Sequence, residues 1–150
     1  MDANPLQKLS REPIKKFLDQ PLIARIATCN PSTFQPHVVP VWYEWDGQSV
    51  WISSFRSTRK IKEIQKNDRV ALVVDIAPDG ETNMGVIFEG SVELIDDPQF
   101  GIRQGTSIYA RYLGQDGALA DTPQSWLHDP EHVLIKLSPD WVYVWGFPGV

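Results

Sequence analysis

An Asp46-Gly47 pair lies between two runs of β-branched and aromatic residues, 37–45 and 49–54. Asp-Gly between such runs is the strongest short-range signal for a β-hairpin, because glycine readily adopts the positive φ that tight hairpin turns require. Similar runs predict five further strands, over 23–29, 70–75, 86–94, 132–137 and 141–145. A turn at Ser138-Pro139-Asp140 is expected to separate the last two strands.

Helical patterns are few. Apolar spacing and capping residues predict helices over 12–19 and 57–67, from Asp97-Pro98 onward, and over 124–127. Ser10 and Thr58 are the expected N-caps of the first two helices, and 115–122 is predicted to be a polar loop. Seven strands with few flanking helices favour a closed or nearly closed antiparallel barrel, a mainly β fold with minor α, over an α/β sheet.

The chain has 150 residues, which suits one domain with one apolar core, so residues 1–150 are predicted to form a single domain. A formal net charge of −5 disfavours nucleic acid and anionic membranes as partners. The longest aliphatic run, 70–74, is too short to cross a bilayer, and no secretory pattern is present. Cys29 is the only cysteine, which excludes an intrachain disulfide. A cytoplasmic protein is expected.

The stretch 51–61 runs from the end of a predicted strand, through a hydroxyl-rich turn, into the start of a predicted helix. Four cations lie at or near the positive end of this helix: Arg56, Arg59, Lys60 and Lys62. Each cation forgoes or costs about 0.3–1 kcal/mol of helix stability there, because the N-terminal end of a helix dipole is positive. A bound phosphate would reverse the sign of that cost, because free N–H groups, hydroxyls and cations together form an anion site. The alternative is a capped helix whose basic side chains extend into water.

A proline interrupts the extended apolar run that begins at Pro36-His37. Pro40 removes one ladder donor, so the strand is predicted to lie at a sheet edge or to carry a bulge. Such a bulge would turn backbone groups toward a ligand. Pro40 is explained equally well as a residue that only prevents mispairing at the edge of the sheet.

Together these stretches resemble the pyridoxamine 5'-phosphate oxidase-like, FMN-binding split-barrel family. The similarity lies in 37–42, 51–54, Arg59-Lys60, 67–72 and 88–92. It is strongest over 22–98 and looser in the remainder of the chain. The order and spacing of these motifs carry the resemblance, since each motif alone is permissive.

The resemblance implies a split barrel of six or more strands that forms a homodimer, with FMN in a groove between the subunits. The residues that would hold the phosphate and ribityl end are Ser53, Ser54, Arg59 and Lys60, with Thr58 at the helix start also among the cofactor-binding residues. The backbone that would lie along the isoalloxazine ring is that of His37, Val38, Val39 and Pro40. Val41 and Trp42 would border the ring or the substrate pocket.

The implied function is that of an FMN-dependent oxidoreductase acting on an unknown small substrate, with no nameable catalytic acid or base. Vitamin B6 oxidation is not expected from the resemblance. Gly85 stands where pyridoxamine phosphate oxidases proper tend to carry a flavin-contacting Gln, and their substrate-binding C-terminal Arg/His segment has no match in this sequence. One alternative is a deazaflavin-dependent reductase, whose basic channel would be lined, if the N-terminal helix folds over the site, by Lys8, Arg11, Lys15, Lys16 and Arg25. Another is a flavin-binding stress or sensory protein without turnover. No metal site is expected, since the three histidines are scattered.

Overall fold

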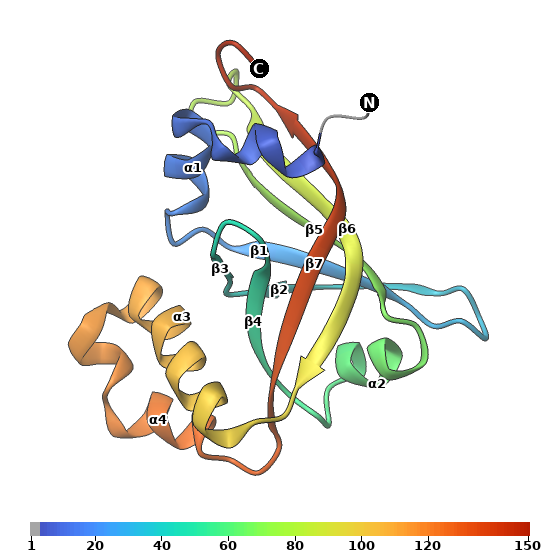
Figure 1. The fold of residues 1–150 in the computed structure, drawn as a ribbon, viewed down its shortest axis with the longest axis vertical. Coiled ribbons are helices and arrows are strands. Elements are labelled where there is room, and N and C mark those ends of the chain that lie inside the picture. Colours follow the sequence, from blue (N-terminus) through green and yellow to red (C-terminus); the bar gives the residue numbers. More distant parts are fainter. Residues whose placement is uncertain (1–3) are drawn as a thin grey trace.

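The structure, a computed structural model, describes residues 4–150. One seven-stranded antiparallel sheet curls into a half-barrel with the strand order β2-β1-β5-β6-β7-β4-β3 (Figure 1). The strands are β1 (Ala24–Cys29), β2 (Pro36–Val41), β3 (Glu44–Trp45), β4 (Val50–Phe55), β5 (Arg69–Ile76), β6 (Met84–Ile95) and β7 (His132–Trp145). The helices are the 3₁₀ helix η1 (Pro5–Ser10), α1 (Glu12–Leu18), α2 (Arg59–Lys66), α3 (Pro98–Ala118) and α4 (Asp121–Leu127). The predicted mainly β split barrel with flanking helices is confirmed.

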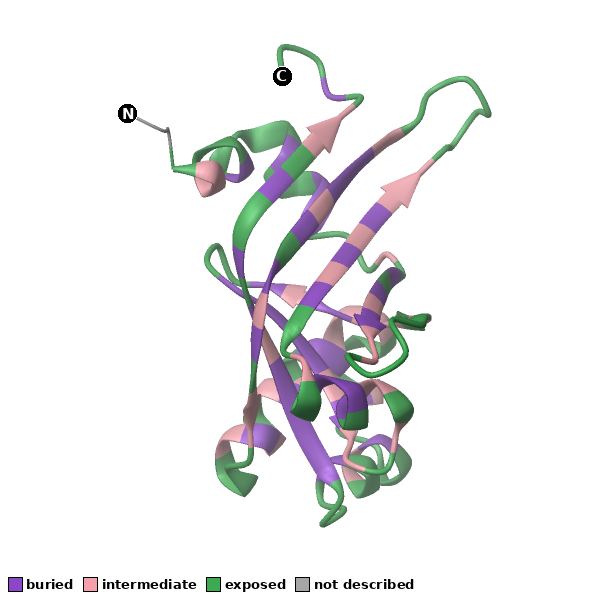
Figure 2. Cartoon of the chain, turned by 90° about the vertical axis from the view of Figure 1, so that its right-hand side faces the viewer, coloured by how far each residue is buried: buried purple, intermediate pink, exposed green. Residues whose placement is uncertain are grey.

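The core fills the concave side of the sheet. Residues alternate between buried and less buried along the strands (Figure 2), as expected for a sheet with one face in the core. The strand registers align Ile26, Leu72 and Phe88 in one row, and each is at most 1% exposed. Burying side chains of this size contributes about 1.5–3 kcal/mol each. Helices η1 and α1 lie at one end of the half-barrel, and α3 and α4 lie at the other (Figure 1).

The hairpin predicted at Asp46-Gly47 is present. Glu44 pairs with Trp51, and Trp45 pairs with Val50, on either side of the turn. The Asp46 carboxylate accepts hydrogen bonds from the backbone N–H groups of Gln48 and Ser49 at 2.8 and 2.7 Å. Gly47 adopts φ +96°, the conformation for which glycine is suited.

The strand predicted over 37–45 is wrong as one element, because the chain leaves the sheet at Trp42 and Tyr43. The Tyr43 backbone N–H donates to the Tyr112 hydroxyl at 3.0 Å, and its carbonyl accepts from Arg111 at 2.8 Å. Side chains of α3 thus satisfy backbone groups that a strand would pair. β2 therefore ends at Val41 and pairs with β1 at the sheet edge, as Pro40 predicts.

The turn predicted at 138–140 is also wrong, since β7 runs unbroken through it. The register of β6 and β7 shifts at this point: Gly90 pairs with Pro139 and Glu89 pairs with Trp141, which leaves Asp140 as an extra residue. A bulge tolerates proline because no ladder hydrogen bond is required of it there.

Helix ends differ from the predictions in two places. Arg11, not Ser10, precedes α1, and the Ser10 hydroxyl donates to the Gln7 carbonyl. The predicted loop over 115–122 is largely helical, because α3 continues past a break at Gly114 (φ +78°).

Within residues 4–150, no helix has the length and apolarity needed to cross a membrane.

Candidate functional site

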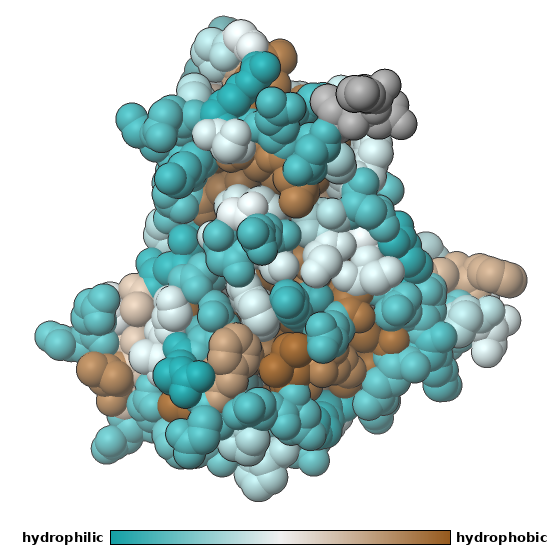
Figure 3. All heavy atoms as spheres, viewed as in Figure 1, coloured by the Kyte–Doolittle hydropathy of each residue, from teal (hydrophilic) through white to brown (hydrophobic). Residues whose placement is uncertain are grey.

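A cavity of about 250 Å³ lies where the two ends of the curled sheet meet. Its lining residues come from β2 and the segment after it, from β4, and from three helices: Pro40, Val41, Trp42, Ser53, Ser54, Phe55, Lys60, Tyr109 and Trp126. Apolar side chains gather between α3 and α2 on this face, over β4 (Figure 3). We call this space the seam cavity.

The seam cavity joins strands that do not pair with each other. β2 is one edge of the sheet, and β4 is next to the opposite edge strand, β3. Curling brings Pro40 at the end of β2 and Ser54 on β4 to the same cavity. The site therefore depends on the closure of the barrel, which no local segment determines.

The start of α2 offers backbone donors to this cavity wall. Thr58 stands at the N-cap position, but its hydroxyl donates to the Phe55 carbonyl at 2.8 Å and does not cap the helix. The N–H groups of Arg59, Lys60 and Ile61 make no hydrogen bond within residues 4–150. A helix start with free N–H groups attracts anions.

Lys60 is the cation that lines the seam cavity. It is half-buried, and its ammonium makes no ion pair within the described part of the chain. Burial lowers the pKa of Lys60, because a charged ammonium is poorly solvated there. An anion beside Lys60 would offset that loss of solvation.

Two of the other cations in this motif already have carboxylate partners. Arg59 donates to Glu63 at 3.0 Å, and Arg56 pairs with Asp96, which precedes α3. A hydrogen bond from the Thr28 hydroxyl, joined by Arg59, lowers the pKa of Glu63. Lys62 is exposed. The excess of cations at this helix start is thus partly neutralised inside the chain.

Six of the eleven residues assigned by resemblance line the seam cavity: Pro40, Val41, Trp42, Ser53, Ser54 and Lys60. Five do not. His37 and Val39 lie further along β2, Val38 is 64% exposed on the outer face, and Arg59 points to Glu63. The Thr58 hydroxyl is 3.4 Å from that of Ser54, directly behind the lining.

Four residues of this region were not predicted as site residues from the sequence. Three line the cavity and the last lies behind them: Phe55, Tyr109, Trp126 and His132. Tyr109 stacks edge-on against Trp42 at 5.8 Å and against Trp126 at 5.9 Å. Ser53 hydrogen-bonds both to the Tyr109 hydroxyl at 3.0 Å and to His132 Nε2 at 2.8 Å. Tyr109 and His132 follow Ser53 by 56 and 79 residues, and no spacing signal links them.

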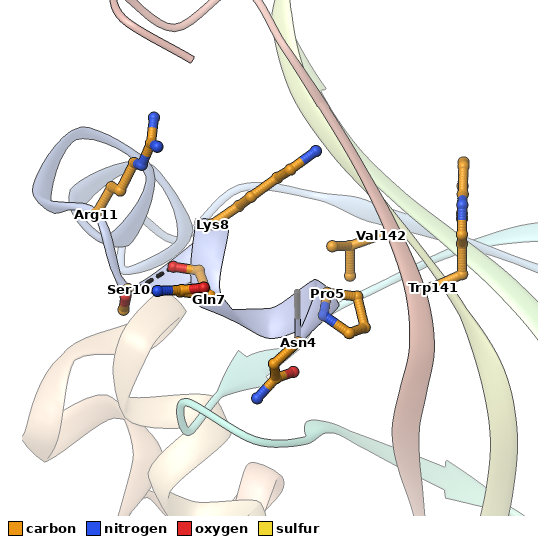
Figure 4. Close-up of a pocket in the computed structure, with 8 residues that line it drawn as sticks. All are labelled: Asn4, Pro5, Gln7, Lys8, Ser10, Arg11, Trp141 and Val142. Carbon is orange, nitrogen blue, oxygen red and sulfur yellow. Dashed lines mark hydrogen bonds between the residues drawn. The ribbon is translucent and has the colours of Figure 1, made fainter. Parts of the chain in front are cut away.

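The basic channel expected beneath the N-terminal helix does not form beside the seam cavity within one chain. Lys8 and Arg11 line a separate cavity of about 620 Å³ between η1 and β7, where the Lys8 side chain extends toward Val142 and Trp141 (Figure 4). Lys15 lines a third cavity, next to the 46–47 turn. No group of three or more potential metal ligands occurs within residues 4–150.

The fold and the seam cavity are those of a split-barrel protein with an anion-attracting helix start. The chain belongs to the pyridoxamine 5'-phosphate oxidase family, whose model matches residues 10–146. No curated protein matches it.

Solved structures share the fold. A conserved hypothetical protein of Mycobacterium tuberculosis is 24% identical, with 94% of this chain and 90% of that chain covered and a TM-score of 0.78. An F420 reductase is 26% identical, with 86% and 94% covered and a TM-score of 0.66. General Stress Protein 26 of Bacillus anthracis is 18% identical, with 89% and 91% covered and a TM-score of 0.66.

Proposed function

We propose that this chain is a cytoplasmic, FMN-dependent oxidoreductase that acts as a homodimer on a small substrate in the seam cavity. The observation that carries the proposal is Lys60, a half-buried ammonium without an ionic partner in the described chain, placed in the cavity wall beside Ser54. A phosphorylated ligand would supply the negative charge that pairs with the Lys60 ammonium.

The donors around the helix start fit a phosphate group. Lys60, the Ser54 hydroxyl and the free N–H groups at the start of α2 are all donors, and phosphate oxygens are acceptors only. Hydrogen bonds to a charged group contribute about 1.5–3 kcal/mol each. We assign the phosphate to this end of the cavity and the isoalloxazine ring to the wall formed by Pro40, Val41 and Trp42.

When bound, FMN supplies hydride or electron transfer, and the chain supplies position and access. Trp42 stacks on Tyr112 at a 4.6 Å centroid distance, which holds the Trp42 indole rigidly at the cavity wall. Tyr109 packs edge-on against Trp42, Trp126 packs against Tyr109, and all three line the cavity. These aromatic side chains give an apolar wall to the space in which a substrate would meet the ring.

Exposed apolar side chains support the homodimer. Strand registers align one outward-facing row across five strands, formed by the apolar residues Pro40, Val73, Ile87 and Tyr143 and by Arg25, which pairs with Asp75. Trp141 and Tyr143 are 45% and 51% exposed and stack on each other. Pro40 belongs both to this row and to the seam cavity, so a second copy seated on the outer face would lie beside the cofactor. Aromatic anchors of this kind are typical of interfaces.

Titration of the purified protein with FMN and with riboflavin tests the proposal. We expect saturable FMN binding, followed by quenching of flavin fluorescence, and at least tenfold weaker binding of riboflavin, which lacks the phosphate. Equal affinities would remove the phosphate assignment, and no saturation with FMN would end the proposal.

A deazaflavin coenzyme is the second candidate, favoured by the 26% identity to the F420 reductase. Its acidic tail would need cations beyond the phosphate site, and Lys8 and Arg11 of a partner copy are the candidates. Competition between FMN and F420 for the same protein separates the two candidates. Bound FMN that NADPH and NADH both fail to reduce would instead support a binding protein without turnover.

A further inference from the structure

Three polar side chains form a continuous hydrogen-bonded row that leads away from the seam cavity. The Tyr109 hydroxyl lies 3.0 Å from Ser53 Oγ, and Ser53 Oγ lies 2.8 Å from His132 Nε2. Tyr109 and Ser53 both line the cavity, whereas His132 is only 8% exposed and does not. The row connects α3, β4 and β7 through the barrel wall.

His132 lines a different cavity, of about 200 Å³, on the far side of the row. The other titratable residues that line it are Asp96, Asp97, His128 and Asp129. Within residues 4–150, no buried side-chain nitrogen or oxygen lacks a hydrogen-bond partner, and His132 Nδ1 makes no hydrogen bond. Solvent therefore reaches Nδ1. We call this second space the acidic cavity.

The first turn of α3 leaves room for the imidazole. A Cβ added to Gly101 would lie 3.3 Å from His132 Nδ1, slightly tighter than ordinary van der Waals contact, and 3.5 Å from Cε1. Glycine at this position allows the ring to lie between the two cavities. Its edge packs against Phe55, with the ring centroids 6.3 Å apart.

We propose that Tyr109, Ser53 and His132 form a proton relay that carries protons from the acidic cavity to the substrate in the seam cavity. The proposal rests on the proposed redox function of that cavity. Tyr109 is the terminal proton donor, and His132 is the entry point for protons from solvent.

The relay supplies the proton that a hydride acceptor lacks. A carbonyl acceptor that takes a hydride gains two electrons and one proton, and its oxygen needs one further proton. The O–H bond of Tyr109 breaks as that oxygen is protonated; Tyr109 Oη takes the Ser53 proton, and Ser53 Oγ takes the proton from His132 Nε2. Nδ1 then accepts a proton from a water molecule in the acidic cavity, and the hydroxide left behind is neutralised by the bulk buffer. One proton crosses, and the three side chains end uncharged.

The electrostatics suit these roles. Burial, and then the charge of Arg56, lower the pKa of His132, while Asp129 opposes them. The Arg56 guanidinium is paired with Asp96, which limits its effect. Burial raises the pKa of Tyr109, so its hydroxyl remains protonated at neutral pH. The relay therefore consists of neutral groups, each able both to give and to accept a proton.

The tautomer of His132 tests the relay without any cofactor. Delivery toward Tyr109 requires the proton of the neutral imidazole to lie on Nε2, donating to Ser53. We expect nitrogen-15 NMR of histidine-labelled protein at pH 7.5 to show the Nε2–H tautomer at His132, and Ser53→Ala to shift its resonances. A neutral ring protonated on Nδ1 would overturn the proposal.

Kinetics provide the second test, with NADPH as the reductant and menadione as the acceptor of a hydride and a proton. With FMN-loaded protein, His132→Gln should slow menadione reduction at least tenfold and change its solvent isotope effect, since general acid catalysis contributes about 10²–10⁴-fold. Tyr109→Phe, which keeps the ring, should act likewise. His128→Gln is the matched control: His128 lines the same acidic cavity but bonds the Gln124 carbonyl.

The outcomes separate the relay from the function on which it rests. If the protein and its variants bind FMN equally but His132→Gln reduces menadione as fast as His128→Gln, the relay is wrong and the FMN assignment stands. If the unaltered protein binds no FMN, the proposed function fails, and the relay, which rests on it, is overturned with it.

Discussion

Arg59 donates a hydrogen bond to Glu63 at 3.0 Å, one turn further along α2. Glu63 is buried and also accepts from Thr28 on β1. The Glu63 carboxylate thus joins α2 to the sheet, and the Arg59 guanidinium is its partner within the helix, whereas the neighbouring Lys60 ammonium lines the seam cavity without a partner in the described chain. The adjacent cations Arg59 and Lys60 therefore have different roles, the first structural and the second in ligand binding.

This division predicts unequal effects on FMN affinity. Lys60→Ala should weaken FMN binding about 10-fold to 100-fold, the loss of one charge-assisted hydrogen bond, and should leave riboflavin binding unchanged. Arg59→Ala should weaken FMN binding less than threefold. Lys62→Ala, which removes an exposed cation from the same helix, is the matched control. A larger effect of Arg59→Ala than of Lys60→Ala in fluorescence titration would refute the division.

Arg111 joins α3 to the end of α1. Its guanidinium donates to the carbonyls of Tyr43, Leu18, Asp19 and Gln20, the last three at the exposed end of α1. Arg111→Ala should lower the free energy of unfolding by about 2 kcal/mol or more, because several charged hydrogen bonds are lost together. Arg103→Ala, on the exposed face of the same helix, should change it by less than about 0.5 kcal/mol. Urea denaturation of both variants measures the difference.

Gly90 marks the close approach of β6 to the bulge in β7. A Cβ there would meet the Ser138 carbonyl oxygen and would lie 2.9 Å from the Pro139 Cα, both of them backbone atoms that cannot rotate away. Gly90→Ala should therefore destabilise the fold by about 1–3 kcal/mol, the usual cost of overpacking. Glu93→Ala, exposed on the same strand, is the control for thermal unfolding. Equal melting temperatures for Gly90→Ala and Glu93→Ala would show that the bulge in β7 shifts to accommodate the added Cβ.

The lowered pKa of His132 predicts how stability depends on pH. Since the folded state disfavours the imidazolium, the unfolded chain binds more protons below its own pKa of about 6.5, and stability falls as pH decreases through that value. His132→Gln removes this contribution. The difference in melting temperature between the original protein and the variant should shift in favour of the variant from pH 7.5 to pH 5.5. A constant difference would show that His132 titrates normally.

The sequence predicted what depends on neighbouring residues. Asp46-Gly47 specifies its own turn, and Pro40 excludes a central strand position for β2. The turn expected at 138–140 failed for the opposite reason: Pro139 is tolerated because β6 supplies Gly90 opposite the bulge. That partner lies about 50 residues away, beyond the reach of any local pattern.

The candidate site divides in the same way. Ser54 and Lys60 lie in one motif and were named from it, whereas Tyr109, Trp126 and His132 reach the region only through the packing of α3, α4 and β7. Internal pairing also altered the meaning of the motif, because the carboxylates of Glu63 and Asp96 neutralise two of its cations. Pairing of side chains from separate elements becomes visible only in three dimensions.

We propose that the start of α2 binds the phosphate of a flavin nucleotide through Lys60. Equilibrium dialysis of FMN against the original protein and Lys60→Ala, repeated with riboflavin, measures this directly. We expect FMN to bind the original protein at least tenfold more tightly than riboflavin, and the variant to lose this preference. A variant that still prefers FMN as strongly as the original protein would contradict it.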